Sequence, residues 1–255
     1  EVALEIRDEG GKVVRSYSST PDADYKLYEG APSRNAILPK EKVLNRFVWD
    51  LRHEGLPGSP EVYIEGSFRG HRAMPGMYTI RLGYGSNSVE TEGRITPNPL
   101  IPTTQEEWRD YHAFMQEAED TYTEMTLMTN RLHGLKGRLE TLTGHLEDTG
   151  QEDLLAKANS TLKKLEAWDD EMVQRLSQAY DDVENFPNKF SVEYLFLINQ
   201  TENSWPRVNR SSIDRKKELD TQWNLLKKEA DVFLKDRVPA FNKTLWDAGI
   251  GAIMF

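Results

Sequence analysis

The sequence predicts two successive folding units, an antiparallel β-sandwich over residues 1–100 and an up-and-down antiparallel helical bundle over residues 104–255. Apolar residues recur at every second position as far as about residue 100, and from residue 104 they recur at every third or fourth position. A proline-rich segment, Pro97–Pro102, separates the two patterns. The change of period at this hinge is the main evidence for two units.

The first unit is predicted to contain about six short strands. Residues 2–8 and 12–18 alternate on either side of Gly10-Gly11, which is typical of a β-hairpin. A polar stretch from Ser19 to about Lys42 follows, and turn-forming Gly, Pro and Asn residues separate the later strands. Many short strands without a helical period favour a sandwich. The later alternating stretches are residues 45–55, 61–66, 77–84 and 88–95.

The second unit is predicted to contain three long helices. The first begins with a capping box, Thr104-Gln-Glu-Glu107, and carries one apolar stripe. The apolar stripe of each helix must be buried against another helix, and the connecting turns are short, so the helices are expected to be antiparallel. Pro239 is expected to kink or break the last helix. The long helices cover about 104–147, 151–185 and 212–248, with a short helix at about 191–201.

The net charge of −10 belongs almost entirely to the second unit. Residues 1–103 carry 13 Lys and Arg against 14 Asp and Glu, a net of −1, and residues 104–255 carry 19 against 28, a net of −9. This balance argues against a nucleic-acid partner. No apolar run is long enough for a membrane span. The chain starts directly on a strand pattern without an initiating Met, so we expect a piece of a longer or processed protein.

The segment 45–55, NRFVWDLRHEG, places its largest apolar side chains at alternate positions. Phe47, Trp49 and Leu51 are therefore expected on the buried face of a sandwich strand. Asp50 and Arg52, with Arg46 on the same side, are expected to form an exposed ion pair. In the alternative interpretation, a ligand or another domain contacts a cluster at the strand end, formed by Asp50, Arg52, His53 and Glu54.

Two motifs carry a family resemblance. NRFVWDLR (45–52), followed by MPGMYTIRL (74–82), resembles the C-terminal region of large exported bacterial proteins with sortilin-like or neuraminidase-type (BNR) β-propeller repeats, often labelled glycosyl hydrolases. The ending PAFNKTLWDAGI (239–250) is similar as well. The resemblance implies an Ig-like module followed by a helical segment. Its signature residues are Phe47, Trp49, Asp50, Leu51, Arg52, Pro75, Gly76 and Tyr78.

The histidines and acidic clusters indicate no metal or catalytic site at the level of sequence. His53, His71, His112, His133 and His145 show no pair with the spacing of a helical zinc site, so each is expected to be partly solvated. Asp22, Asp24 and Glu29 lack the glycine and the final acidic residue of a calcium loop. The carboxylates at 169–171 and 181–184 are expected on a solvated helix face, without the cleft that a glycosidase needs.

The remaining motif searches also give no enzyme signature. The chain has neither a glycine-rich phosphate loop nor a Gly-x-Ser-x-Gly elbow, and it contains no cysteine for a thiol nucleophile or a disulfide. We therefore expect no catalytic residue, no cofactor and no metal. A second interpretation is that Tyr25, Tyr28, Tyr63 and Tyr84 stack on sugar rings. His53, Glu54, Tyr25 and Tyr28 are the candidates for an interaction site.

The function expected from these observations is that of a non-catalytic accessory region. As the resemblance implies, it is the C-terminal region of a larger exported protein and acts in interdomain packing or protein–protein interaction. Its partner is then an upstream β-propeller of the same chain, or a second copy of this region, in an extracytoplasmic location. The alternative is a carbohydrate- or peptide-binding module of a glycoside hydrolase system.

Overall fold

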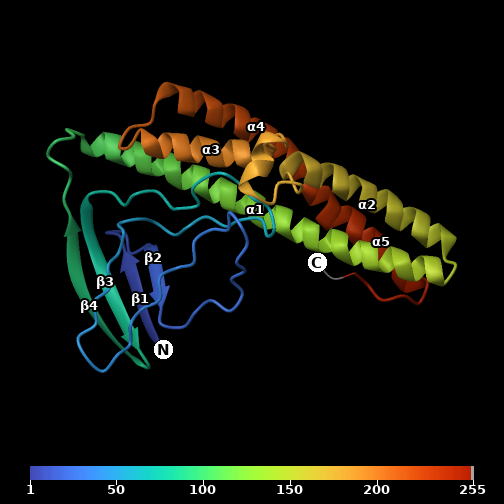
Figure 1. Ribbon diagram of the computed structural model, residues 1–255, viewed down its shortest axis with the longest axis horizontal. Helices are drawn as coiled ribbons and strands as arrows, with labels where there is room; N and C mark the ends of the chain where they lie inside the picture. Colours follow the sequence, from blue (N-terminus) through green and yellow to red (C-terminus); the bar gives the residue numbers. More distant parts are fainter. Residues whose placement is uncertain (254–255) are drawn as a thin grey trace.

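The computed structural model describes residues 1–253 and shows one small sheet attached to an elongated array of helices (Figure 1). The sheet is antiparallel, with strand order β2-β1-β3-β4. Its strands are β1 (Val2–Arg7), β2 (Val13–Ser18), β3 (Gly76–Tyr84) and β4 (Asn87–Ile95). The predicted hairpin 2–18 is thus confirmed, and the strands predicted at 77–84 and 88–95 are present and pair with each other.

The pairing register assigns one apolar and one polar face to the sheet. Leu4 lies opposite Tyr17 on one side and Leu82 on the other, and Leu82 lies opposite Val89. Directly opposed residues of an antiparallel pair project to the same face, so these side chains share the apolar face. The opposite face carries the row Glu5, Arg81 and Glu90.

The predicted Ig-like β-sandwich is wrong, because residues 45–55 and 61–66 form no strands and no second sheet is present among residues 1–253. Residues 45–55 have no regular secondary structure apart from a single isolated bridge from Arg52 to Arg72. Residues 56–68 pack on the helices instead, where Leu56, Ile64 and Phe68 join the core of the helical array. An alternating pattern predicts an extended segment with one buried side, but the same pattern fits a segment that packs on a helix.

Phe47 and Trp49 pack on the sheet but are only partly buried, which corrects the expectation that Phe47, Trp49 and Leu51 all lie in a sandwich core. The Phe47 ring packs edge-on against Tyr17, with ring centroids 4.6 Å apart, and Trp49 packs in the same way against Tyr78 at 5.6 Å. The Trp49 indole N–H also donates to the Arg52 carbonyl at 2.9 Å. Leu51 does not share their buried side: its backbone has a φ of 58° and its side chain is 46% exposed.

Helix α1 (Gln105–Asp148) runs the length of the molecule and carries the other elements (Figure 1). Its predicted capping box is confirmed, with the Glu107 backbone N–H donating to Thr104 Oγ1 and the Thr104 N–H donating to the Glu107 carboxylate. Helices α3 (Phe190–Asn203) and α4 (Arg210–Val232) pack along its first half. Helices α2 (Glu152–Met172) and α5 (Val238–Asp247) lie along its second half.

The predicted up-and-down bundle of three long helices is also wrong, because the second helix is shorter than predicted and the other helices pack on different halves of α1. The third predicted helix, at about 212–248, corresponds to one uninterrupted helical segment over residues 210–247. Helix α2 ends at Met172 rather than near 185, and a short 3₁₀ helix, η1 (Tyr180–Glu184), follows. The Asp182 carboxylate accepts the backbone N–H groups of Gln178 and Ala179 and so replaces α-helical bonds there. Helix α4 is capped by Asn209, and it passes through a π-helical turn, η2 (Phe233–Arg237), into α5, directly before Pro239.

Candidate functional site

The candidate site lies where two paired loops of the sheet unit meet helix α1. The His53 N–H donates to the His71 carbonyl at 3.0 Å, and the Ala73 N–H donates to the Leu51 carbonyl at 2.8 Å. Gly70 allows this approach, because a Cβ at this position would lie 2.2 Å from the Glu54 carbonyl oxygen. The loop pairing therefore holds His53 and His71 side by side against α1.

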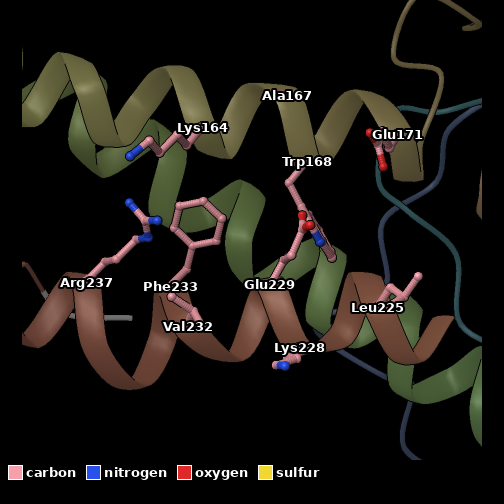
Figure 2. Close-up of a pocket in the computed structure, with 10 residues that line it drawn as sticks. All are labelled: Lys164, Ala167, Trp168, Glu171, Leu225, Lys228, Glu229, Val232, Phe233 and Arg237. Atoms are coloured by element: carbon pink, nitrogen blue, oxygen red, sulfur yellow. The ribbon is translucent and has the colours of Figure 1, made fainter. Parts of the chain in front are cut away.

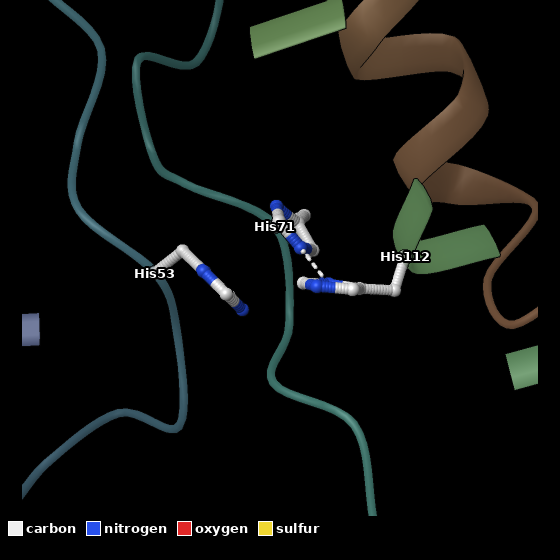
Figure 3. A group of neighbouring side chains, drawn as sticks. All are labelled: His53, His71 and His112. Carbon is white, nitrogen blue, oxygen red and sulfur yellow. Dashed lines mark hydrogen bonds between the residues drawn. The ribbon is translucent and has the colours of Figure 1, made fainter. Parts of the chain in front are cut away.

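Three histidines meet at this point: His53 and His71 from the loops and His112 from α1 (Figure 3). The His53 and His71 rings are stacked, with centroids 3.9 Å apart. His71 Nε2 lies 2.8 Å from His112 Nδ1, and one potential ligand nitrogen from each residue lies within 4.8 Å of the others. His71 is fully buried and His53 is 8% exposed, so the expectation of partly solvated histidines is wrong for this pair.

Glu119 fixes the orientation of His71. It lies on α1 seven residues after His112, on the same face of the helix. One of its carboxylate oxygens lies 2.7 Å from His71 Nδ1, and the other accepts the His71 backbone N–H at 2.7 Å. With its proton on Nδ1, the His71 ring points the lone pair of Nε2 toward His112.

Burial and the neighbouring imidazoles keep His53 and His112 uncharged. Burial, reinforced by His71 and His112, lowers the pKa of His53 to about 2. Burial and His71 likewise lower the pKa of His112 to about 4. Burial raises the pKa of Glu119, against the hydrogen bonds from His71 that lower it. At neutral pH His53 and His112 therefore offer neutral imidazole nitrogens, the form that binds metal ions.

Beside the histidines, Glu202 at the end of α3 links the loops to the helices. Its carboxylate accepts Arg52 Nη1 at 3.0 Å and the Tyr111 hydroxyl, and Arg72 Nε lies 3.6 Å away. Arg52 also donates to the Gly70 carbonyl at 2.8 Å. Arg52 thus pairs with Glu202 and not with Asp50, which contradicts the predicted exposed ion pair. The alternative role of Arg52 and His53 in an interdomain contact fits this geometry better.

The other interaction candidates lie outside this cluster. Glu54 accepts the backbone N–H and hydroxyl of Ser16 and pairs with Arg15. The Tyr25 hydroxyl donates to the Pro32 carbonyl, and burial raises the pKa of Tyr28 to about 12. Of the other two tyrosines considered for sugar stacking, Tyr63 packs edge-on against Tyr180, whereas Tyr84 lies at the β3–β4 turn.

Two members of the acidic runs take structural roles. Asp169 is buried and pairs with Arg175 through two hydrogen bonds of 2.7 Å, and the half-buried Asp182 caps the 3₁₀ helix. The other acidic residues of these runs are exposed as predicted: Asp170, Glu171, Asp181 and Glu184. A groove of about 550 Å³ separates α2 from α4 and η2 (Figure 2). Its side chains include the aromatic rings of Trp168 and Phe233 and the cationic groups of Lys164 and Arg237.

Comparison with known proteins adds no relative. No protein-family model, no curated protein and no solved structure matches the chain. Within residues 1–253, no helix combines the length and apolar character that crossing a membrane requires.

Sequence reasoning missed the histidine cluster because its members come from different elements. His71 is 41 residues from His112, and all three histidines come together only when the loops pair and dock on α1. No spacing within one helix or strand could have revealed the cluster. One feature of the sequence could have indicated the cluster: Arg-His occurs at 52–53 and the reverse dipeptide, His-Arg, at 71–72. The bridge between Arg52 and Arg72 places these two dipeptides opposite each other.

Proposed function

We propose that this chain is a non-catalytic accessory module that packs its sheet against another protein domain. Part of the apolar face of the sheet is uncovered, and this observation carries the proposal. Phe47 and Trp49 cover the part of the face near Tyr17 and Tyr78. Leu82, Tyr84 and Val89 on the same face are 40%, 68% and 66% exposed. Contiguous exposed apolar side chains of this kind mark interaction surfaces.

The open edge of the sheet favours a partner that is itself built of strands. Strand β4 is an edge strand, so one side of its backbone has unpaired N–H and C=O groups within the described part of the chain. A strand laid along β4 would pair these groups and cover Val89 and Leu82 at the same time. An upstream β-propeller of the same polypeptide, the partner implied by the family resemblance, has this character.

The test is a sedimentation-velocity titration of this chain with the separately produced upstream region of its polypeptide. We expect a complex that the double substitution Leu82→Lys and Val89→Lys abolishes, because two charges on the apolar face would have to be buried. The matched control is Ser88→Lys, which places one charge on the opposite, polar face of the same strand. If the unsubstituted chain shows neither complex formation nor self-association, the proposal fails.

A further inference from the structure

We infer that His53, His71 and His112 form a binding site for one divalent transition-metal ion of the zinc class. This inference does not depend on the proposed function, because it concerns the junction of the loops with α1 and not the sheet face. Imidazole nitrogen is a preferred ligand of zinc, copper and nickel ions. Three histidines with a water molecule in the fourth position form a tetrahedral site with one open position.

The distances between the rings are close to those that an ion requires. A zinc ion bound at 2.0–2.1 Å from each nitrogen places tetrahedral ligand nitrogens roughly 3.3 Å apart. In the cluster, the His71 and His112 nitrogens are 2.8 Å apart, and all three ligand nitrogens lie within 4.8 Å of one another. Binding of one ion therefore requires small shifts of these side chains.

The contacts of His71 are those of a metal ligand. Histidines that bind metal ions commonly donate their other ring N–H to a carboxylate, which fixes the tautomer and makes the ligand nitrogen more basic. The Glu119 carboxylate provides this contact at 2.7 Å from Nδ1, while Nε2 points into the cluster. Glu119 also accepts the His71 backbone N–H, so both the ring and its backbone are held in place.

His53 provides an independent observation. Its side chain is more than nine-tenths buried and lies against His71, at 5.1 Å between ring centroids from His112. Its backbone N–H and C=O are both hydrogen-bonded, which fixes the loop that carries the ring. A metal ion between the three rings would bind one of the His53 ring nitrogens.

The charges around the cluster suit a cation. Glu119 supplies a carboxylate directly behind His71. An ion held here would cross-link both loops of the sheet unit to α1, and it would therefore stabilise the docking of the sheet unit on the helices.

The first test is zinc binding by the full chain after treatment with a chelator, measured by isothermal titration calorimetry. We expect one zinc ion per chain and a higher thermal unfolding midpoint with zinc. His112→Ala removes one ligand from the surface of α1 and is expected to weaken binding at least about 100-fold. Glu119→Gln is expected to weaken it about 10- to 100-fold, because the amide cannot accept both bonds from His71.

The matched control is His145→Ala, which removes an exposed histidine from the same helix and is expected to leave the affinity for zinc unchanged. NMR of the ¹⁵N-labelled unsubstituted chain gives a readout that requires no variant to fold: zinc should shift the ring nitrogens of three histidines and leave His133 and His145 unshifted. Zinc binding that is equal in the unsubstituted chain and His112→Ala, or no binding at all, would overturn the inference.

Discussion

The helical array and the sheet unit are held together by different kinds of contact. The helices share one continuous apolar core that runs from Leu56 in the loops to Ile253. The sheet has a separate and much smaller core around Ile6, Val14 and Tyr78. Between them, the side chains of the junction are largely polar: the three histidines, Glu119, Glu202 and two arginines.

This difference indicates that the two regions differ in how readily they can be separated. Burial of apolar area is non-directional and tolerates small shifts of packing, whereas a buried polar network is favourable only when every member has a partner. The sheet unit therefore has one defined position on α1, set by these hydrogen bonds and ion pairs together with the apolar contacts of residues 56–68. We expect that position to be more sensitive to single substitutions in the junction than the helical core is.

The largest decrease in the free energy of unfolding is expected from a substitution in the helical core. Trp168 is 2% exposed and its indole N–H donates to the Leu226 carbonyl, so Trp168→Ala should lower the free energy of unfolding by about 3–5 kcal/mol. Trp49 is only half-buried on the sheet, and Trp49→Ala should cost about 1–3 kcal/mol. Urea unfolding followed by far-ultraviolet circular dichroism measures both losses. Equal losses would contradict the contrast between the two cores.

A smaller, local effect is expected from a substitution in the junction. Glu202→Gln removes the charge that pairs with Arg52 and Arg72 and should lower the free energy of unfolding by about 1–3 kcal/mol. Amide hydrogen exchange should become faster in residues 51–54 and 70–73, because local opening of the loops becomes easier, while the centre of α1 stays protected. Uniform acceleration over the whole chain would show that the sheet unit and the helices unfold as one.

The smallest effect is expected at Asp50. This residue is exposed and Arg52 pairs with Glu202 instead, so Asp50→Ala should change the free energy of unfolding by no more than about 0.5 kcal/mol. Urea unfolding beside Glu202→Gln provides the comparison. If Asp50→Ala lowered the free energy of unfolding as much as Glu202→Gln, the result would support an ion pair between Asp50 and Arg52. It would contradict the role of Glu202 in linking the loops to the helices.

Local features of the fold were predictable because they depend on neighbours in the sequence. The hairpins follow from alternation around glycine turns, and the start of α1 follows from the Thr104–Glu107 capping box. The second sheet was predicted wrongly because alternation in residues 61–66 shows that one side of the segment is buried but not what it packs against. Val62 and Ile64 are indeed buried, but against helices.

The candidate site was not predictable from spacing, because it depends on contacts between distant residues. One of the two interpretations of the segment 45–55 placed Arg52 and His53 in a contact with a ligand or another domain, and both residues lie in the junction. Their partners, Glu202 and His112, lie on helices. The periodicity of these helices in the sequence shows which side is apolar, but not which polar residues meet the loops. The assignment of Arg52 to Asp50 failed because the positive φ of Leu51 turns the chain and breaks the alternation of sides.

The π-helical turn at Phe233–Arg237 sets the rotational phase of the C-terminal helix. Its Val238 N–H donates to the Phe233 carbonyl, five residues earlier, so this turn holds one residue more than an α-helical turn. Each residue advances an α-helix by about 100°. Without the additional residue, α5 would be rotated by roughly that angle, and Phe241 and Leu245 would leave the core that they now share with α2. One residue of chain length therefore determines which side of the last helix meets the rest of the protein.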